Sequence, residues 1–242
     1  MKISVAQTRP VKGDIAANIE MHKKFTALAV SYQADAIFFP ELSVTGYEPG
    51  LSEELATEQG DSRLDDFQNI SNTHQLTIGL GIPIKSEKGI QISMVIFQPG
   101  KPRLTYSKQQ LHEDEFPYFV CGNSQVIFTT GNKKIAPAIC YESLQPGHSE
   151  NASRLGAEIY VASVAKSQKG IDKALLHFPG IAKKYAMTVL MSNCIGYCDN
   201  FESYGNSAVW DNKGLLAGRL DNKSEGILIY DTETGEVIEE TI

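Results

Sequence analysis

Residues 76–106, LTIGLGIPIKSEKGIQISMVIFQPGKPRLTY, contain apolar runs that alternate with short turn signals. This pattern predicts strands at Leu76–Ile82, Ile92–Phe97 and Arg103–Tyr106, because each run is short, apolar and bounded by turn-forming residues. Only turn signals such as Gly100-Lys101-Pro102 separate these strands, so hairpins must occur here. A purely doubly wound sheet, with a helix in every connection, is therefore excluded.

Helical patterns flank this block and alternate with further strands. Helical spacing of apolar residues covers Asp14–Ala29, Asp61–His74, Ser149–Leu155 and Ile171–Ala186, and Asp14 is a typical N-cap residue. The other predicted strands are Lys2–Gln7, Ala36–Phe39, Gln125–Thr129, Lys134–Ile139, Ile159–Ala162, Thr188–Asn193, Ser207–Trp210 and Gly226–Tyr230. Helices have to cover the outer faces of the sheets, which predicts an α/β sandwich of two mixed sheets with helices outside. No repeat or linker divides the chain, so we expect a single domain over residues 1–242.

The amino-acid composition indicates which kinds of partner the protein can bind. The chain has 242 residues, of which 42% are hydrophobic, and a formal net charge of −7. This acidic balance lacks the basic surface that nucleic acid or an anionic membrane needs, so we expect neither, and small molecules or proteins instead. No apolar run reaches the roughly 20 residues that cross a bilayer, and no signal-peptide core follows the N-terminus. A cytoplasmic location is expected, with the four cysteines present as thiols.

Three reactive side chains lie just past the ends of predicted strands. Glu41 follows Ile37-Phe38-Phe39-Pro40, Lys108 follows Leu104-Thr105-Tyr106-Ser107, and Cys140 follows Ile135-Ala136-Pro137-Ala138-Ile139. Strand ends are where α/β enzymes place catalytic groups, because the sheet holds them rigid while the loops open onto a crevice. Each residue alone is more often structural, so the hypothesis depends on the combination.

Three motifs surround these side chains: Phe39-Pro40-Glu41-Leu42-Ser43-Val44-Thr45-Gly46-Tyr47, Tyr106-Ser107-Lys108-Gln109-Gln110-Leu111-His112 and Ile139-Cys140-Tyr141-Glu142. In order and spacing they resemble the nitrilase superfamily of carbon–nitrogen hydrolases. The resemblance runs from Val5 near the start to Gly214 near the end. It implies a four-layer αββα sandwich and a Glu-Lys-Cys triad, here Glu41, Lys108 and Cys140.

The chemistry of the three groups suits this implied triad. A free thiol has a pKa of about 8.5, so Cys140 needs a base or a nearby cation to become an effective nucleophile. A carboxylate in a water-poor pocket has a raised pKa, which suits Glu41 to take the thiol proton and later activate water. Lys108 would donate to the oxygen that becomes negative in each tetrahedral intermediate. The resemblance makes the backbone N–H of Tyr141 the second donor.

Two further acids are candidates for supporting roles. The resemblance implies another Glu on the loop after the lysine, and the segment His112-Glu113-Asp114-Glu115 offers two, of which we favour Glu115 over Glu113. The resemblance also indicates that Glu142 orients the turn at Cys140 through hydrogen bonds. Both are supporting, not reacting, groups in this interpretation.

Other kinds of site fit less well. Cys194 and Cys198 with His177 could suggest zinc, but a structural zinc site needs four ligands and no second cysteine pair exists. A papain-like pair would need a histidine beside Cys140, and His148 is the one tempting choice, although a histidine on a surface helix is the commoner explanation. We therefore expect no metal and no cofactor.

The predicted function is cleavage of a carbon–nitrogen bond in a small amide through a cysteine thioester. The motifs look more like the amidase and carbamoyl-amidase branches than true nitrilases; a nitrilase, an N-carbamoyl amidohydrolase or a catalytically silent binding member are the alternatives. Expected pocket walls are the loops Thr45–Leu51, His112–Phe119 and Ser163–Lys173, where Lys166 or Lys173 could attract an acidic substrate. The resemblance also implies a homodimer, paired through Pro146–Leu155 and Ile171–Lys184.

Overall fold

Two mixed β-sheets packed face to face form the centre of the molecule. A computed structural model describes residues 1–242. One sheet has seven strands in the order β15-β14-β1-β2-β3-β4-β5, the other has six in the order β13-β12-β9-β8-β7-β6, and β10 pairs with β11 in a separate hairpin. Neighbouring strands are parallel from β1 to β3 and from β7 to β9, and antiparallel elsewhere.

The elements alternate along the chain as the sequence pattern predicts. The strands are β1 Lys2–Gln7, β2 Ala36–Phe38, β3 Thr77–Ser86, β4 Gly89–Phe97, β5 Leu104–Ser107, β6 Phe128–Thr130, β7 Lys133–Ile139, β8 Ile159–Val164, β9 Thr188–Asn193, β10 Ile195–Cys198, β11 Phe201–Tyr204, β12 Ala208–Trp210, β13 Leu216–Arg219, β14 Gly226–Asp231 and β15 Val237–Thr241. The α-helices are α1 Ile15–Ser31, α2 Ser52–Leu55, α3 Asp65–His74, α4 Pro146–Arg154 and α5 Gln168–Tyr185. Short 3₁₀ turns include η3 Glu113–Glu115 and η4 Cys140–Leu144.

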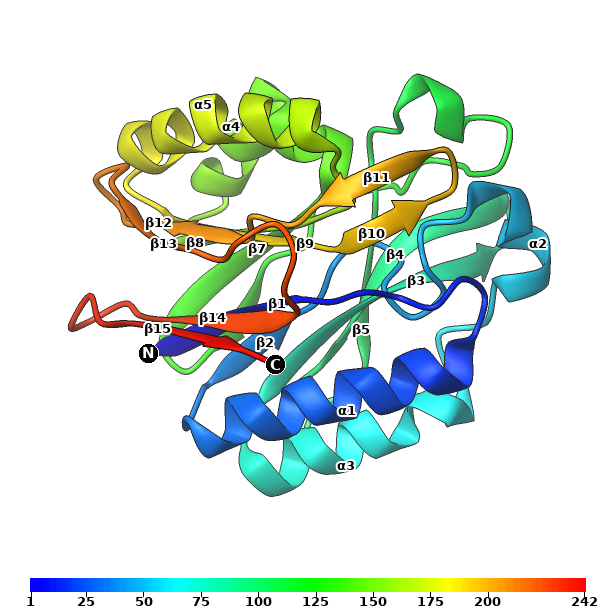
Figure 1. Ribbon diagram of the computed structural model, residues 1–242, viewed down its shortest axis with the longest axis horizontal. Coiled ribbons are helices and arrows are strands. Elements are labelled where there is room, and N and C mark those ends of the chain that lie inside the picture. Colours follow the sequence, from blue (N-terminus) through cyan, green and yellow to red (C-terminus); the bar gives the residue numbers. More distant parts are fainter.

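Four layers follow from three hydrophobic clusters. Figure 1 shows α1 and α3 below the seven-stranded sheet, and α4 and α5 above the six-stranded sheet. One cluster lies between the sheets, one under α1 and α3, and one under α4 and α5. Each sheet is therefore covered on both faces, and the predicted αββα sandwich is confirmed.

The strands of the two sheets are apolar on both sides because both sides are buried. In β2, Ala36 and Phe38 pack between the sheets, whereas Ile37 faces the cluster under the helices. In β8, Ile159 and Val161 point to the neighbouring sheet and Tyr160 points to α5 and its neighbours. Side chains alternate across a strand, so a strand buried on two faces reads as a continuous apolar run.

The predicted hairpin block is present and longer than expected. β3 and β4 pair antiparallel from Ile78 with Phe97 to Ser86 with Gly89, and β5 continues this edge. The prediction ended the first strand at Ile82, but the pairing runs through Pro83. Because neighbouring pairs hold the ladder on both sides of that residue, one missing backbone N–H donor does not end the strand.

Several elements differ from the sequence pattern. The strands β10, β11, β13 and β15 were not predicted, since they are short and carry polar residues at the molecular edge. α4 begins at Pro146 instead of Ser149, because a proline at the first helical position lacks only a hydrogen bond that the helix start leaves unmade anyway. None of the helices combines the length and the apolar character needed to cross a membrane.

Candidate active site

The ends of three strands bring the candidate side chains to one pocket. Glu41 lies just after β2 and Lys108 directly after β5, both in the seven-stranded sheet, whereas Cys140 follows β7 in the facing sheet. A pocket of about 490 Å³ opens here and is lined by Cys140 and Glu115 among others. A volume of this size suits a small molecule.

A sharp turn presents Cys140 at the end of β7. Its φ is +47°, in the left-handed region that non-glycine residues rarely adopt. The buried Glu142 carboxylate holds this turn, because it accepts hydrogen bonds from the Ile139 N–H at 2.7 Å and from the Tyr106 hydroxyl at 2.6 Å. Its second oxygen accepts from the Gln109 N–H at 2.6 Å. One carboxylate thus ties the turn at Cys140 to the turn after Lys108.

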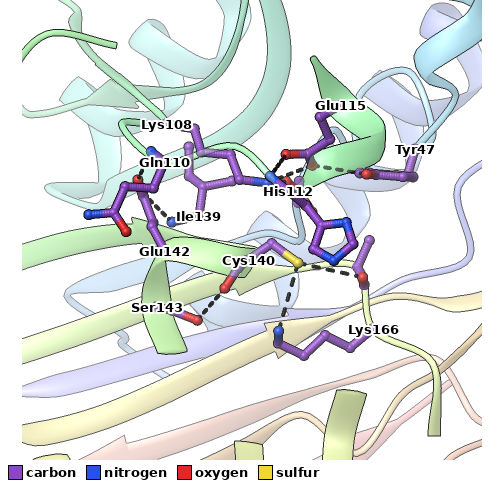
Figure 2. Close-up of polar contacts among 12 residues, drawn as sticks. Tyr47, Lys108, Gln110, His112, Glu115, Ile139, Cys140, Glu142, Ser143 and Lys166 are labelled. Atoms are coloured by element: carbon purple, nitrogen blue, oxygen red, sulfur yellow. Dashed lines mark hydrogen bonds and ion pairs between the residues drawn. The ribbon is translucent and has the colours of Figure 1, made fainter. Parts of the chain in front are cut away.

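Lys108 lies at the centre of a buried charge cluster (Figure 2). Its ammonium donates to Glu41 Oε1 at 2.7 Å and to Glu115 Oε1 at 2.6 Å, and all three side chains are at most 1% exposed. The Tyr47 hydroxyl donates to the same Glu115 oxygen at 2.9 Å, and the His112 N–H donates to the other at 2.7 Å. Glu115 is therefore fully engaged in holding Lys108.

Glu41 keeps one oxygen free. While Oε1 accepts from Lys108, Oε2 is buried and makes no hydrogen bond. Burial raises the pKa of Glu41; the Lys108 charge opposes this shift and the Glu115 charge adds to it. A buried, unpartnered carboxylate oxygen with a raised pKa has the properties of a proton acceptor.

The pKa values of Cys140 and Lys108 are both raised, which keeps the thiol neutral and the lysine charged. The pKa of Cys140 is raised to about 12: burial is the largest cause and the Glu41 charge adds to it, while the charges of Lys166 and Lys108 partly oppose them. Burial alone would lower the pKa of Lys108, but the carboxylates of Glu41 and Glu115 raise it above the ordinary value. Lys108 therefore stays charged, while the resting Cys140 is a thiol.

Two glycines allow the turns that carry these charges to approach the sheet. A Cβ on Gly81 in β3 would overlap the Pro40 carbonyl oxygen and the Leu42 nitrogen, which flank Glu41. A Cβ on Gly122 would overlap the Ser107 carbonyl oxygen, and the Gly122 N–H donates to the Lys108 carbonyl at 2.7 Å. Glycine is required at both places because backbone touches backbone.

The structure separates the alternatives at the acidic loop. Glu115 is buried against Lys108, whereas Glu113 is exposed. The side chain of Tyr141 lines the pocket, with its ring 5.3 Å from that of His112.

His148 does not lie on the surface, contrary to the expectation for this helix. It is 3% exposed, and its two ring nitrogens lie 2.8 Å and 2.7 Å from the Tyr106 and Tyr160 hydroxyls. Burial lowers its pKa to about 4. Its ring contacts these tyrosines and the Gln125 side chain, with the Glu142 carboxylate 3.7 Å away, and Cys140 is not among its hydrogen-bond partners. The side chain faces inward because α4 packs its polar residues against the tyrosines of β5 and β8.

The other two buried cysteines make no hydrogen bond to Glu41, Lys108 or Cys140. Cys194 and Cys198 are buried with their sulfurs 3.5 Å apart, and Cys194 also contacts the Ser203 hydroxyl at 3.2 Å. His177 lies on α5, and no three side chains of metal-binding type come together with suitable spacing.

All three predicted loops contribute to the pocket wall: the first by Tyr47, the second by His112, Asp114 and Glu115, and the third by Ala165, Lys166, Ser167, Gly170 and Lys173. Sequence reasoning missed Phe201, since the hairpin of β10 and β11 was not predicted, and it missed the contact between Lys166 and Cys140. A signal for Lys166 was present, because it follows the end of β8 as the other three follow β2, β5 and β7.

A buried lysine, two buried carboxylates and a pocket-facing thiol on a layered αββα scaffold are the features of an enzyme site. The family model for carbon-nitrogen hydrolases matches residues 2–239, and the chain belongs to this family. It is 24% identical to the probable nitrilase C965.09 of Schizosaccharomyces pombe, over 95% of this chain and 88% of that protein. It is 26% identical to the 2-oxoglutaramate amidase of Bacillus subtilis, over 86% of this chain and 82% of that protein.

Longer proteins also match. The glutamine-dependent NAD(+) synthetase of Thermotoga maritima is 24% identical over 98% of this chain, which spans only 42% of the synthetase.

Among solved structures, an amidase of the nitrilase superfamily from Nesterenkonia sp. AN1 has the same fold. A cysteine-to-alanine variant of it in complex with butyramide aligns with a TM-score of 0.87 and 21% identity, over 95% of this chain and 89% of that one. A glutamate-to-glutamine variant of that amidase, with the same TM-score of 0.87 and 21% identity, carries the acetamide moiety of fluoroacetamide on its active-site cysteine and aligns over 95% and 89% of the two chains.

Proposed function

We propose that this protein hydrolyses the carbon–nitrogen bond of a small linear amide through a thioester on Cys140. The observation that carries the proposal is the free Oε2 of Glu41, buried in the same charge cluster as Lys108 beside the pocket that Cys140 lines. This arrangement supplies a nucleophile, a base and a fixed cation, which acyl transfer requires.

Acylation begins with proton transfer from the Cys140 thiol to Glu41. The sulfur then attacks the amide carbonyl carbon, the C=O electron pair moves to oxygen, and Lys108 and the Tyr141 N–H donate to that oxyanion. When the tetrahedral intermediate collapses, the C–N bond breaks and Glu41 returns the proton to the departing amine. The products of this half-reaction are an acyl thioester and ammonia or an amine.

Deacylation reuses the same groups. Water enters the pocket, Glu41 removes its proton, and the hydroxide attacks the thioester carbon while Lys108 again stabilises the oxyanion. Collapse breaks the C–S bond, and Glu41 protonates the leaving sulfur. Glu115 holds Lys108 in place, and Tyr47 holds Glu115. No group therefore has to move far between the two half-reactions.

An amide is the substrate class that the relatives favour. The Bacillus subtilis relative is an amidase of 2-oxoglutaramate, and the Nesterenkonia variant was solved with butyramide. The likeness to a probable nitrilase keeps nitriles as the competing substrates. A panel of short aliphatic amides, ω-amides, N-carbamoyl compounds and nitriles, assayed for released ammonia, will identify the preferred class.

The triad variants provide the decisive test. Cys140→Ala, Glu41→Gln and Lys108→Ala should each lose most turnover while their circular dichroism spectra stay native, and the lysine variant should lose at least about 10²- to 10³-fold, as for a lost oxyanion donor. Because the groups act as one unit, a double variant should be scarcely worse than a single one. Cys121→Ala is the matched control, since that thiol is exposed and outside the pocket.

Trapping the thioester tests the mechanism itself. Wild type and Glu41→Gln are incubated with an activated ester, quenched in acid and digested, and the acyl mass should be found on the peptide that holds Cys140. Turnover that persists in Cys140→Ala, or a wild-type Cys140 that reacts with an alkylator no faster than Cys121, would refute the proposal and favour a silent binding protein.

A further inference from the structure

A second lysine contacts the reactive sulfur. Lys166 follows β8, its ammonium lies 3.8 Å from Cys140 Sγ, and its side chain lines the pocket although it is only 6% exposed (Figure 2). No carboxylate lies within ion-pair distance of it, and the sulfur is its ammonium's one hydrogen-bond partner. A buried ammonium without a carboxylate is costly unless another anion faces it.

The backbone of Lys166 is held rigidly. Its N–H donates to Asn193 Oδ1 at 2.9 Å, and its carbonyl accepts from the Tyr204 N–H at 2.9 Å and the Ser203 hydroxyl at 3.2 Å. Gly170 of α5 lies against its aliphatic chain, and a Cβ there would come within 3.1 Å of Lys166 Cβ. The ammonium is therefore positioned by the surrounding structure and does not reach the sulfur by chance.

The charges around Cys140 balance only when Lys166 is counted. With both carboxylates ionised, Glu41, Glu115 and Lys108 carry a net charge of −1, and Lys166 brings the cluster to neutrality. The rim of the pocket adds Lys173 and a hydrogen bond between the His112 ring and the Asp114 carboxylate. The nearest cation without a carboxylate partner is thus the one that faces the sulfur.

The two lysines favour different positions of one proton. Lys108 bonds to the Glu41 carboxylate, so its charge stabilises the state in which Cys140 is still a thiol. When the S–H bond breaks and an O–H bond forms on Glu41, the electron pair stays on sulfur, and the negative charge moves from the neighbour of Lys108 to the neighbour of Lys166. A fixed cation beside the sulfur stabilises the state after transfer more than the state before it.

Resting on the proposed function, we propose that Lys166 is the counter-ion of the Cys140 thiolate and thereby a second lysine of the reaction. In this proposal Lys108 pairs with the two carboxylates and stabilises the oxyanion, whereas Lys166 stabilises the negative charge on the Cys140 sulfur. The electrostatics of the site agree: among the charges that lower the pKa of Cys140 against burial and Glu41, Lys166 has the largest effect and Lys108 the next.

Alkylation of Cys140 across pH tests this role without turnover. Wild type, Lys166→Met and Lys166→Arg are treated with iodoacetamide from pH 6 to 10, and the Cys140 peptide is quantified by mass spectrometry. Lys166→Met should react roughly tenfold more slowly than wild type at each pH of this range, because the cation that favours the thiolate is gone. Lys166→Arg should keep most of the wild-type profile.

Lys169→Met is the matched control, because Lys169 lies on the same segment but is exposed and outside this pocket. Its profile should match wild type. An unchanged profile in a folded Lys166→Met would overturn the proposal. A parallel series uses the anionic reagent iodoacetate. A loss of reactivity confined to iodoacetate would assign Lys166 to a carboxylate on the substrate and would also overturn the proposal. A slow wild-type Cys140 would instead refute the proposed function, so the two failures are distinguishable.

Discussion

Single residues of this protein carry conformations and charges that only their neighbours make tolerable. Cys140 is held at a φ of +47°, which costs on the order of 1 kcal/mol or more for a residue with a Cβ. The Glu142 carboxylate offsets this cost by accepting from the Ile139 and Gln109 N–H groups, and the same bonds aim the sulfur into the pocket. Burial nevertheless raises the pKa of Glu142 to about 7.

A buried histidine supports the turn that holds Glu41. His22 of α1 is fully buried, and its neutral ring satisfies both nitrogens: Nδ1 donates to the Asn18 carbonyl at 2.5 Å, and Nε2 accepts from the Ser43 hydroxyl at 2.8 Å. Burial lowers the pKa of His22 from 6.5 to about 4. Protonation would turn Nε2 into a second donor, reverse the hydrogen bond with Ser43 and place a charge on a fully buried ring.

We predict that this histidine makes the fold sensitive to acid. The unfolded chain binds the proton at a higher pH than the folded chain, so the free energy of unfolding falls as pH drops from 6.5 towards 4, by at most about 1.4 kcal/mol per pH unit for each such histidine. Urea unfolding at pH 6.5, 5.5 and 4.5 should show a smaller slope in His22→Gln than in wild type.

The comparison of slopes is needed because other groups titrate in the same range. His148, whose pKa burial also lowers to about 4, contributes with the same sign. Glu142, whose pKa is raised, is more stable protonated and contributes with the opposite sign. Equal slopes in wild type and His22→Gln would contradict the assignment.

Elements of the fold act here mainly by how closely they approach one another. β3 packs against the Glu41 turn at Gly81, and the Val44 N–H donates to the Gly81 carbonyl at 3.0 Å. β8 reaches the same turn from the facing sheet, because the Ser163 hydroxyl donates to the Phe39 carbonyl at 2.7 Å. The turn that carries Glu41, the proposed base, is thus fixed from both sheets, which a loop by itself would not achieve.

We predict that Gly81→Ala lowers kcat as well as stability. The new Cβ has to push the Pro40–Leu42 backbone away, and displacing a catalytic group by about 1 Å can cost on the order of 100-fold in rate. Steady-state kinetics combined with thermal unfolding will measure both effects.

Gly79→Ala is the matched control on the same strand. Its Cβ would press on the Phe38 ring in the core, so it should cost about 1–3 kcal/mol of stability as overpacking does, with kcat close to wild type for the folded protein. Equal kcat losses in the two variants would show that the approach of β3 to the Glu41 turn has no special role.

The whole molecule places its site where two sheets meet, and its outer helices remain available for association. Leu176 on α5 is 84% exposed and borders a shallow hollow with Leu144 and His177. Leu155, at the end of α4, is also exposed. These leucines would give a second copy of the chain apolar area to cover on the outer helices.

We predict a homodimer that pairs through α4 and α5. Sedimentation velocity at micromolar concentration should give a dimer mass for wild type, and Leu176→Glu should shift the equilibrium towards monomer, because it places a charge in the apolar contact. The exposed Leu216 of β13 offers a control, since Leu216→Glu lies on a different element. A wild-type protein that sediments as a monomer at these concentrations would contradict the prediction.

The family, the two mixed sheets with outer helices, and the positions of Glu41, Lys108 and Cys140 after strand ends could all be predicted from the amino-acid sequence. These features are local, because apolar periodicity and turn residues specify each strand and where it stops. Motif order then relates the strands to one another. Such a pattern does not predict which side chains, far apart in the sequence, are in contact in the folded protein.

Only the tertiary structure decided that Glu115 and not Glu113 bonds to Lys108, that His148 points inward, and that Lys166 faces the sulfur. Each of these contacts joins segments from different strands or helices, and its partners depend on how the two sheets and their turns pack. That packing sets how deeply a side chain is buried, and burial in turn shifts the pKa of its ionisable group. Two residues of the same type can therefore have different chemistry in the folded protein.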